Sequence, residues 1–431
     1  MRTLYIECGT TKRNTVNSGI QRVVRNVLRE LQEVSEEYGF KSVPVEFTNG
    51  RFVVIHDEPL VPLQSFKPLL MNAFIRLDLY LQNSMFLLLY ARIRSYLKIW
   101  LKEVLGIKNY NNAALKITDK IANVENNPSL VNEASPILLL LDSTWLPGMW
   151  EDVDRFSCAG GHVAAVLYDL IPFSHPDTVD ELTRVAHTSW WLSAPSHLDS
   201  VICISQSVRK EFLTWQKTLK LEKQIPEERV GYFYLGANFK EQDSVVSLVS
   251  ETVPFFLVVG SLEPRKNHKY VLRVFEMLWA NGYNYRLAIV GAYGWKCENI
   301  IKEIVTHAEY NSRLFLIRDA SDRDLAIMYA KTTCVILPSI AEGFGLPIVE
   351  AFQHGAPVLC SDIAVFREVG SNNATYFNVE DYKSLYGLIM QFKVDTGIHL
   401  KESNKLSWIS WSKSAHMLLE YLNQSAKKEV V

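Results

Sequence analysis

The sequence predicts an α/β protein with two doubly wound domains that face each other across a cleft. Two sets of short, continuously apolar segments carry this prediction, one before residue 206 and one after residue 253, with helical patterns between the segments. Strands of a parallel sheet covered on both faces have such unbroken apolar runs. A polar stretch at 236–252 lacks strong periodicity and is the predicted hinge between the two sets.

The first set begins with a strand, a polar loop and a helix. Residues 3–8 form the predicted strand, the loop ends at Gly19, and residues 20–34 have apolar side chains at helical spacing. This order is the opening unit of a doubly wound α/β domain. Further strands are predicted at 43–47, 137–142, 162–169 and 200–205.

The second set has the same alternation of strands and helices. Its strands are predicted at 254–261, 285–291, 314–319, 334–339 and 357–362, with helices at 269–282 and 322–331. We therefore expect an N-terminal domain over 1–240, a C-terminal domain over 241–405 and a final amphipathic helix over 406–431. Ligands of such domains bind beyond the carboxyl ends of the strands.

Residues 66–105 fit neither domain. They are apolar and aromatic, with six basic residues against two acidic ones. A single helix of this length would be about 60 Å long, so we expect an inserted helical hairpin in the N-terminal domain. Two interpretations stay open: a helical pair packed on the sheet, or a surface that lies in an anionic membrane interface.

Composition narrows the class of protein. Lys and Arg total 45 against 47 Asp and Glu, a net charge of −2 that argues against nucleic acid as a partner. The six cysteines are scattered without metal-ligand spacing, and most lie in apolar runs, as in proteins of a reducing compartment. The start lacks the apolar core of a signal peptide, and the longest charge-free apolar stretch, 79–91, is shorter than the roughly 20 residues of a spanning helix. We therefore expect a cytoplasmic protein.

The strongest motif lies at 338–362, where a strand ends and a glycine-containing loop leads into a helix. The loop carries Glu342, and Pro347 opens the helix that carries Glu350. The backbone N–H groups around Phe344, Gly345 and Leu346 would lie at the helix N-terminus, where a phosphate binds favourably. The carboxylate of Glu350 would accept hydrogen bonds from the two hydroxyls of a ribose.

A second motif at 258–270 also leaves a strand and enters a helix. It carries Arg265 and Lys266. Taken alone, these are solvated residues of a turn. Beside an anion-binding helix terminus, they would neutralise a diphosphate and stabilise it as a leaving group.

Together the two motifs resemble those of the family 4 retaining glycosyltransferases, which have the GT-B fold. EGFGLPIVE (342–350) is similar to the E-x7-E motif of that family, and GSLEPRKNH (260–268) is similar to its phosphate-binding loop. The resemblance is strong over 252–375. It is weaker in the N-terminal half, where SGIQRVVRNVL, YDLIPFSHP and VICISQSVRKEF resemble the bacterial subgroup that builds O-antigen and capsule chains, mannosyltransferases included.

The resemblance implies two Rossmann-like domains and a nucleotide-sugar donor held mainly by the C-terminal one. Glu350 would hold the ribose, Glu342 the sugar hydroxyls, and Lys266 with Arg265 the diphosphate. Gly19 would lie near the phosphates and the acceptor. The donor site would also include Ser261 and, next to the base, Asp319.

The sequence departs from the family pattern at two places. Ser261 stands where many relatives have an arginine, which leaves the diphosphate to Arg265 and Lys266. Tyr168 stands where many have a histidine, and Asp169 follows it. Asp169 could accept a hydrogen bond from a substrate hydroxyl or cap the turn that follows; His175 could contact the acceptor or be an ordinary loop histidine.

The expected activity is the retaining transfer of a hexose in surface polysaccharide biosynthesis. The favoured donor is GDP-mannose, and the acceptor a lipid-linked glycan or an oligosaccharide. The resemblance implies that no metal is needed and that the leaving phosphate helps to deprotonate the acceptor; the sequence has no obvious nucleophile with a paired base. Residues 66–105 would contact the cytoplasmic face of the inner membrane. The alternatives are a UDP- or dTDP-sugar donor, a GT-B nucleotide-sugar epimerase, and an inactive binding relative.

Overall fold

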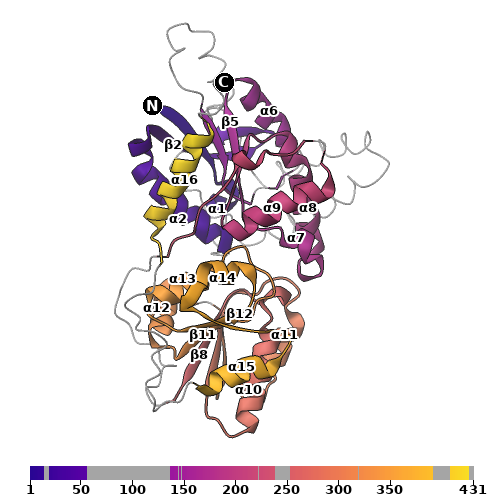
Figure 1. Ribbon diagram of the computed structural model, residues 1–431, viewed down its shortest axis with the longest axis vertical. Coiled ribbons are helices and arrows are strands. Elements are labelled where there is room, and N and C mark those ends of the chain that lie inside the picture. Colours follow the sequence, from indigo (N-terminus) through magenta and orange to yellow (C-terminus); the bar gives the residue numbers. More distant parts are fainter. Residues whose placement is uncertain are drawn as a thin grey trace, which may run out of the picture.

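The computed structural model describes residues 1–13, 19–55, 136–143, 145–146, 148–221, 223–237, 253–318, 320–391 and 408–426. In this part of the chain, two sheets with flanking helices form two domains arranged along the long axis of the molecule (Figure 1). The predicted insertion at 66–105, most of the predicted hinge and Asp319 lie outside the described residues.

The N-terminal sheet has the strand order β3-β2-β1-β4-β5-β6-β7. Its neighbouring strands are parallel except β2 and β3, which pair antiparallel with Val45 opposite Val54. The strands are β1 (Arg2–Glu7), β2 (Phe40–Thr48), β3 (Arg51–Val54), β4 (Ile137–Leu140), β5 (His162–Leu167), β6 (Ser200–Cys203) and β7 (Val230–Tyr232).

The C-terminal sheet is parallel throughout, in the order β10-β9-β8-β11-β12-β13. Its order reverses between β8 and β11, which are neighbours although two strands separate them in sequence. Ligands of open α/β sheets bind at such a reversal. The strands are β8 (Phe255–Val259), β9 (Arg286–Val290), β10 (Leu314–Ile317), β11 (Cys334–Leu337), β12 (Val358–Ser361) and β13 (Thr375–Phe377).

Helices connect the strands in both domains. Those of the N-terminal domain are α1 (Gly9–Arg13), α2 (Gly19–Val34), α6 (Trp150–Cys158), α7 (Ile171–Ser174), α8 (Glu181–Ser193) and α9 (Gln206–Leu219). Those of the C-terminal domain are α10 (His268–Ala280), α11 (Glu298–Val305), α12 (Asp322–Lys331), α13 (Leu346–Gln353), α14 (Ala364–Gly370) and α15 (Tyr382–Gln391), followed by α16 (Trp411–Ser425).

The prediction of two doubly wound domains is confirmed, with local differences. The predicted loop before Gly19 contains a short helix, α1. The strands β3, β7 and β13 are absent from the prediction.

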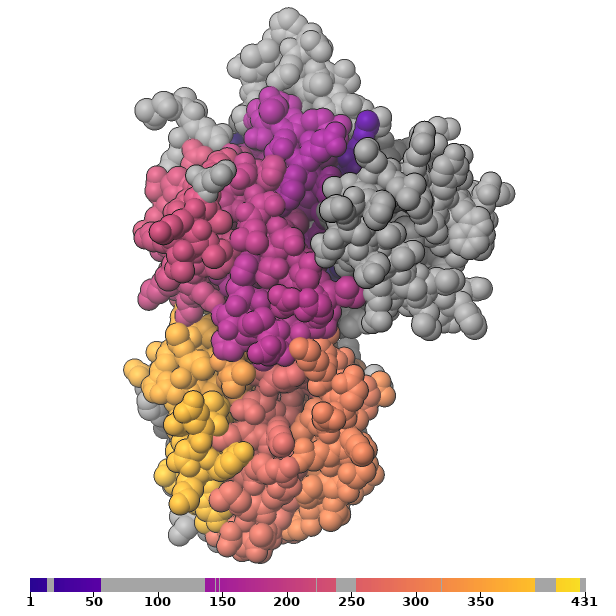
Figure 2. Space-filling model, turned by 90° about the vertical axis from the view of Figure 1, so that its right-hand side faces the viewer, coloured from indigo at the N-terminus to yellow at the C-terminus, as the bar shows by residue number. Residues whose placement is uncertain are grey.

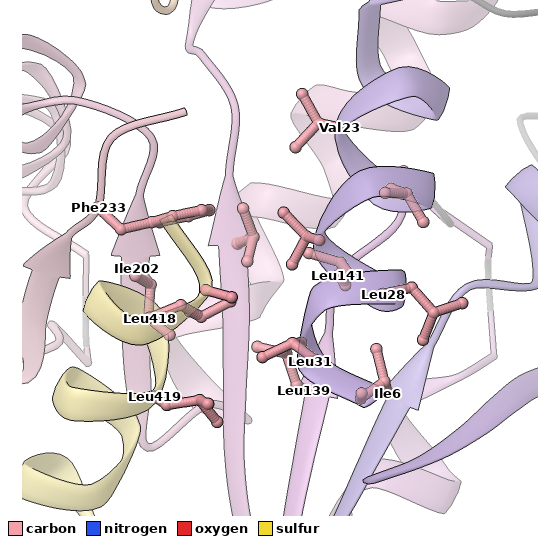
Figure 3. Close-up of a cluster of buried hydrophobic side chains, with 14 of the residues drawn as sticks. Ile6, Val23, Leu28, Leu31, Leu139, Leu141, Ile202, Phe233, Leu418 and Leu419 are labelled. Atoms are coloured by element: carbon pink, nitrogen blue, oxygen red, sulfur yellow. The ribbon is translucent and has the colours of Figure 1, made fainter. Parts of the chain in front are cut away.

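The last helix returns to the N-terminal domain. Figure 3 shows Leu418 and Leu419 of α16 beside Ile202 and Phe233, on the same side of the sheet as helix α2. The backbone N–H of Ala237 donates to the carbonyl of Ile409 at 3.0 Å, so the two chain segments leaving and re-entering this domain lie together. The final helix is thus part of the N-terminal core.

The two domains are in direct contact (Figure 2). Ser205 Oγ donates to the carbonyl oxygen of Gly343 at 2.9 Å. The carboxylate of Glu368 on α14 accepts from the backbone N–H groups of Gln206 and Ser207, both at 2.7 Å, and so caps the start of α9. Among the described helices, none is long and apolar enough to cross a membrane.

Candidate active site

The candidate site lies where β8 and β11 end side by side. Val335 of β11 pairs with Leu257 of β8, so the loops that follow these strands leave the same edge of the sheet. The first loop carries Arg265 and Lys266 in a 3-10 helix (Pro264–Lys266), and the second carries Glu342. The sheet reversal therefore brings both sequence motifs together, as expected for a binding site.

Glu342 is the centre of this cluster. One carboxylate oxygen accepts from Lys266 Nζ at 2.5 Å and from Ser339 Oγ at 2.7 Å, and the other accepts from Arg265 Nη1 at 2.8 Å. Burial alone would raise the pKa of Glu342, but the two cations outweigh it and hold the pKa at about 2. Glu342 is therefore ionised at neutral pH.

Arg265 is fixed from both sides. Its Nε donates to Glu263 at 2.9 Å and its Nη1 to Glu342, and its side chain is 17% exposed. The Oγ of Ser261 donates to the other oxygen of Glu263 at 2.5 Å. Burial by itself would lower the pKa of Arg265, but the negative charges of Glu342 and Glu263 raise it by more than burial lowers it. The guanidinium therefore stays charged. Glu263 is thus a site residue that the prediction missed, although it lies inside the quoted motif.

Lys266 differs from Arg265 in its remaining capacity for hydrogen bonds. An ammonium group has three N–H donors, and Glu342 takes one of them. The stem of Lys266 lies against Gly260 at the end of β8, where a Cβ would come within 3.3 Å of Lys266 Cε. Lys266 can therefore offer donors to a phosphate beside the phosphate-binding loop.

The glycine-containing loop has two backbone requirements. Gly345 is the N-cap of α13 with φ of 102°, a left-handed conformation that favours glycine. Gly343 lies against the carbonyl oxygen of Tyr168 in the other domain, which a Cβ would approach to 2.1 Å. Phe344 is buried in the hydrophobic core of the N-terminal domain, and the partly buried Leu346 packs against the same core. The close approach at Gly343 is therefore a contact between domains.

Glu350 is buried on α13, with 3% of its side chain exposed. One oxygen accepts from Tyr329 Oη at 2.8 Å. The other lies 2.9 Å from Nη1 of Arg22, which belongs to α2 of the N-terminal domain. The sequence predicted Glu350 but neither partner, because nothing in the sequence relates α2 or α12 to α13.

Asp169 borders the cluster from the N-terminal domain. Its Oδ1 accepts from the backbone N–H of Ile171 at 3.0 Å, so the carboxylate caps the turn after β5. Burial raises the pKa of Asp169, and the charge of Arg265 opposes this, which places Asp169 within electrostatic reach of the cluster. His187 Nε2 donates to the Asp169 carbonyl at 3.2 Å.

The other predicted residues lie farther from the cluster centre or outside the described part. Gly19 is the first residue of α2, one turn before Arg22. His175 follows α7, and its Nδ1 is 3.0 Å from Ser174 Oγ. Asp319 is not among the described residues.

Comparison with known proteins agrees with this geometry. Residues 239–406 match the family described as glycosyl transferases group 1. The C-terminal domain is therefore a group 1 glycosyl transferase domain, which confirms the resemblance seen in its two motifs.

Two curated relatives are named as mannosyltransferases. The chain is 32% identical over 308 residues to the serotype-specific mannosyltransferase WbdA of Escherichia coli, a match covering 66% of this chain and 37% of WbdA. It is 26% identical over 277 residues to the O-antigen chain mannosyltransferase RfbU of Salmonella typhimurium, covering 61% of this chain and 73% of RfbU. The chain thus matches only about a third of the length of WbdA.

Solved structures share the fold. Anabaena Alr3699/HepE in complex with UDP has a TM-score of 0.54 at 14% identity, covering 99% of both chains. Sucrose-phosphate synthase from Thermosynechococcus elongatus has a TM-score of 0.53 at 13% identity, covering 99% of this chain and 94% of the synthase. The two-domain architecture is the GT-B fold.

Proposed function

We propose that this protein is a retaining glycosyltransferase that transfers a hexose from a nucleotide-sugar donor to a lipid-linked or oligosaccharide acceptor. The observation that carries the proposal is the contact of Lys266 and Arg265 with Glu342 at the strand-order reversal. The loop of Glu342 leads directly into helix α13, which carries the buried Glu350. This pattern lies inside the group 1 glycosyl transferase domain.

Each residue of the cluster has a proposed role in binding the donor. Lys266 would bind the diphosphate with the N–H donors that Glu342 does not use. Arg265 would add positive charge and hold the carboxylate of Glu342 in place. These cations would stabilise the negative charge that develops on the leaving diphosphate. Glu342, ionised with its pKa held at about 2, would accept hydrogen bonds from the sugar hydroxyls. The diphosphate itself would help to deprotonate the acceptor.

Asp169 is the proposed acceptor-side residue. Its carboxylate belongs to the N-terminal domain and is within electrostatic reach of Arg265. One of its oxygens is occupied by the turn after β5, so the other would accept a hydrogen bond from the attacking hydroxyl. His175 is a second candidate on the same loop.

We propose GDP-mannose as the donor because WbdA and RfbU are both named mannosyltransferases. The alternative donors are UDP- and dTDP-sugars, and HepE was solved with UDP. The test is the thermal stabilisation of the protein by GDP, UDP and dTDP, since a ligand that binds the folded state raises the unfolding midpoint. Stabilisation by GDP alone supports the mannosyl donor; stabilisation by UDP or dTDP keeps the enzyme class and replaces the donor.

The assay of transfer separates the remaining alternatives. Labelled mannose from GDP-mannose should appear on an added oligosaccharide or lipid-linked acceptor with retained configuration. Release of free sugar without an acceptor would favour the epimerase, and the absence of stabilisation by any nucleotide would favour the inactive binding relative.

Lys266→Ala should lower transfer about a hundredfold or more, because it removes a cation from the developing charge. Lys269→Ala, which removes an exposed lysine from the next helix, is the matched control and should keep wild-type activity. Full activity in Lys266→Ala would overturn the assigned site.

The membrane contact is a further proposal from sequence, since residues 66–105 lie outside the described part of the chain. Their basic and aromatic composition would favour an anionic lipid surface. Co-sedimentation with vesicles of phosphatidylglycerol, compared with phosphatidylcholine alone, tests it: equal recovery with both would contradict the anionic interface.

A further inference from the structure

A cross-domain ion pair occupies the carboxylate that the ribose of the donor would need. Arg22 stands on the first turns of α2 in the N-terminal domain, and Glu350 lies on α13 in the C-terminal domain. Their closest atoms, Arg22 Nη1 and Glu350 Oε1, are 2.9 Å apart. The Arg22 side chain is 18% exposed and that of Glu350 3%, so this is a largely buried pair.

Both carboxylate oxygens of Glu350 are in use. Tyr329, a fully buried side chain, donates its hydroxyl to Oε2 at 2.8 Å, while Arg22 faces Oε1. With 3% of Glu350 exposed, a ribose cannot reach this carboxylate unless a group that covers it moves. Tyr329 belongs to the core of the C-terminal domain, whereas Arg22 comes from the opposite domain, so Arg22 is the group that can leave.

We infer that Arg22 and the donor ribose compete for Glu350, so that the Arg22–Glu350 pair sets the affinity for the nucleotide. This inference rests on the proposed function and on the role that the family resemblance implies for Glu350, which is to hold the ribose of the donor. A bound ligand shifts an equilibrium by its differential affinity for the two states. Donor binding therefore releases Arg22, and loss of Arg22 favours the donor.

The released arginine has a second partner within reach. Arg22 Nη2 lies 3.6 Å from Oδ1 of Asp322, whose side chain is 65% exposed at the start of α12. Arg22 can keep this contact when it leaves Glu350, and its charge then faces solvent. Its departure therefore leaves no buried charge without a partner, provided that the ribose hydroxyls take its place on Glu350.

The exchange does not require the domains to separate. The contacts of Ser205 with the carbonyl oxygen of Gly343 and of Glu368 with Ser207 join the domains without using Arg22 or the carboxylate of Glu350. The domains can thus stay in contact while Arg22 changes partner, so donor binding and domain contact are compatible.

The test compares nucleotide affinities of Arg22→Met with those of the wild-type protein by isothermal titration calorimetry. Methionine keeps an apolar stem but cannot donate to Glu350. We expect Arg22→Met to bind the preferred nucleoside diphosphate about tenfold more tightly. Arg29→Met is the matched control, because Arg29 lies on the same helix, is 54% exposed and contacts Glu30 of that helix; it should bind as the wild type does. Equal or weaker binding in Arg22→Met overturns the inference.

A second ligand isolates the competition at the ribose. The 2′,3′-dideoxy form of the same nucleotide has no hydroxyl for Glu350, so it has no reason to displace Arg22. Its affinity should be the same in wild type and Arg22→Met, whereas a tenfold gain for this ligand too would contradict competition at Glu350. If Arg22→Met does not fold, Arg22→Lys replaces it, because lysine lacks the planar fork of arginine; unchanged binding there overturns the inference.

Failure of the proposed function has a different signature. If neither the wild type nor Arg22→Met binds GDP, UDP or dTDP, the donor site itself is wrong and the competition falls with it. If the wild type binds and Arg22→Met binds no better, only the competition is overturned. Binding by Arg22→Met alone would support it most strongly.

Discussion

Replacing Gly343 with alanine would place a methyl group at the contact between the two domains. The added Cβ would lie 2.1 Å from the carbonyl oxygen of Tyr168, well below the 3.4 Å at which ordinary van der Waals contact begins. The atoms must therefore separate by roughly 1 Å. Gly343 needs no special backbone conformation of the kind that Gly345 has, so the effect of alanine there is steric.

Neither side of this contact can move freely. Tyr168 Oη donates to the Leu141 carbonyl at 2.7 Å, which ties the end of β5 to the end of β4. The carbonyl of Gly343 accepts from Ser205 at 2.9 Å. Relief of the overlap therefore separates the domains, at the cost of about 1–3 kcal/mol that overpacking of a close-packed contact brings. Such a cost shifts the equilibrium constant between the joined and the separated arrangement by about 5- to 150-fold.

The assay measures transfer and nucleotide binding side by side. We expect kcat/KM of Gly343→Ala to fall at least about tenfold, because a misplacement of about 1 Å between donor and acceptor groups is enough to slow a reaction strongly. Nucleotide stabilisation should be retained, since the loops after β8 and β11 are in one domain. Small-angle scattering should show a larger radius of gyration.

Gly387→Ala is the matched control. Gly387 lies within α15, and a Cβ there meets no atom within 4 Å. Alanine should keep activity and raise stability slightly. Wild-type kcat/KM and unchanged scattering in Gly343→Ala would refute the reasoning.

Three further predictions concern protons, the domain contact and metal ions. Burial lowers the pKa of His187 to about 4. Between about pH 6.5 and pH 4, the unfolded chain therefore carries a proton on His187 that the folded chain does not. His187 should therefore reduce the free energy of unfolding by about 2 kcal/mol between pH 7 and pH 5 in urea titrations, and a pH slope that is not reduced in His187→Phe would contradict this. Glu368→Ala removes a carboxylate that accepts from the backbone N–H groups of Gln206 and Ser207; it should lower stability by about 1 kcal/mol in thermal unfolding, and an unchanged midpoint would exclude the cap. EDTA should leave transfer unchanged, because side-chain cations supply the positive charge for the diphosphate, whereas a loss of activity that Mg²⁺ restores would disprove the metal-independent mechanism.

The sequence by itself predicted both sheets because their strands are continuous apolar runs. Residues 334–339 and 254–261, for example, contain β11 and β8. The meeting of Lys266 with Glu342 also followed from local patterns. Each residue comes after a strand, and the carboxyl ends of parallel strands lie at one edge of the sheet.

Only the tertiary structure decided which residues make contacts between the two domains. Arg22 and Glu350 are far apart in sequence, and each lies on an amphipathic helix whose pattern shows only which face is buried. Gly343 looks like a turn residue in the sequence, yet its missing Cβ makes room for Tyr168 of the other domain. The final helix packs on the first domain for the same reason: its apolar face fits any complementary surface, and only the path of the chain selects α2 and β6 as its neighbours. Periodicity encodes elements and their buried faces, whereas the partners of those faces depend on the packing of the whole chain.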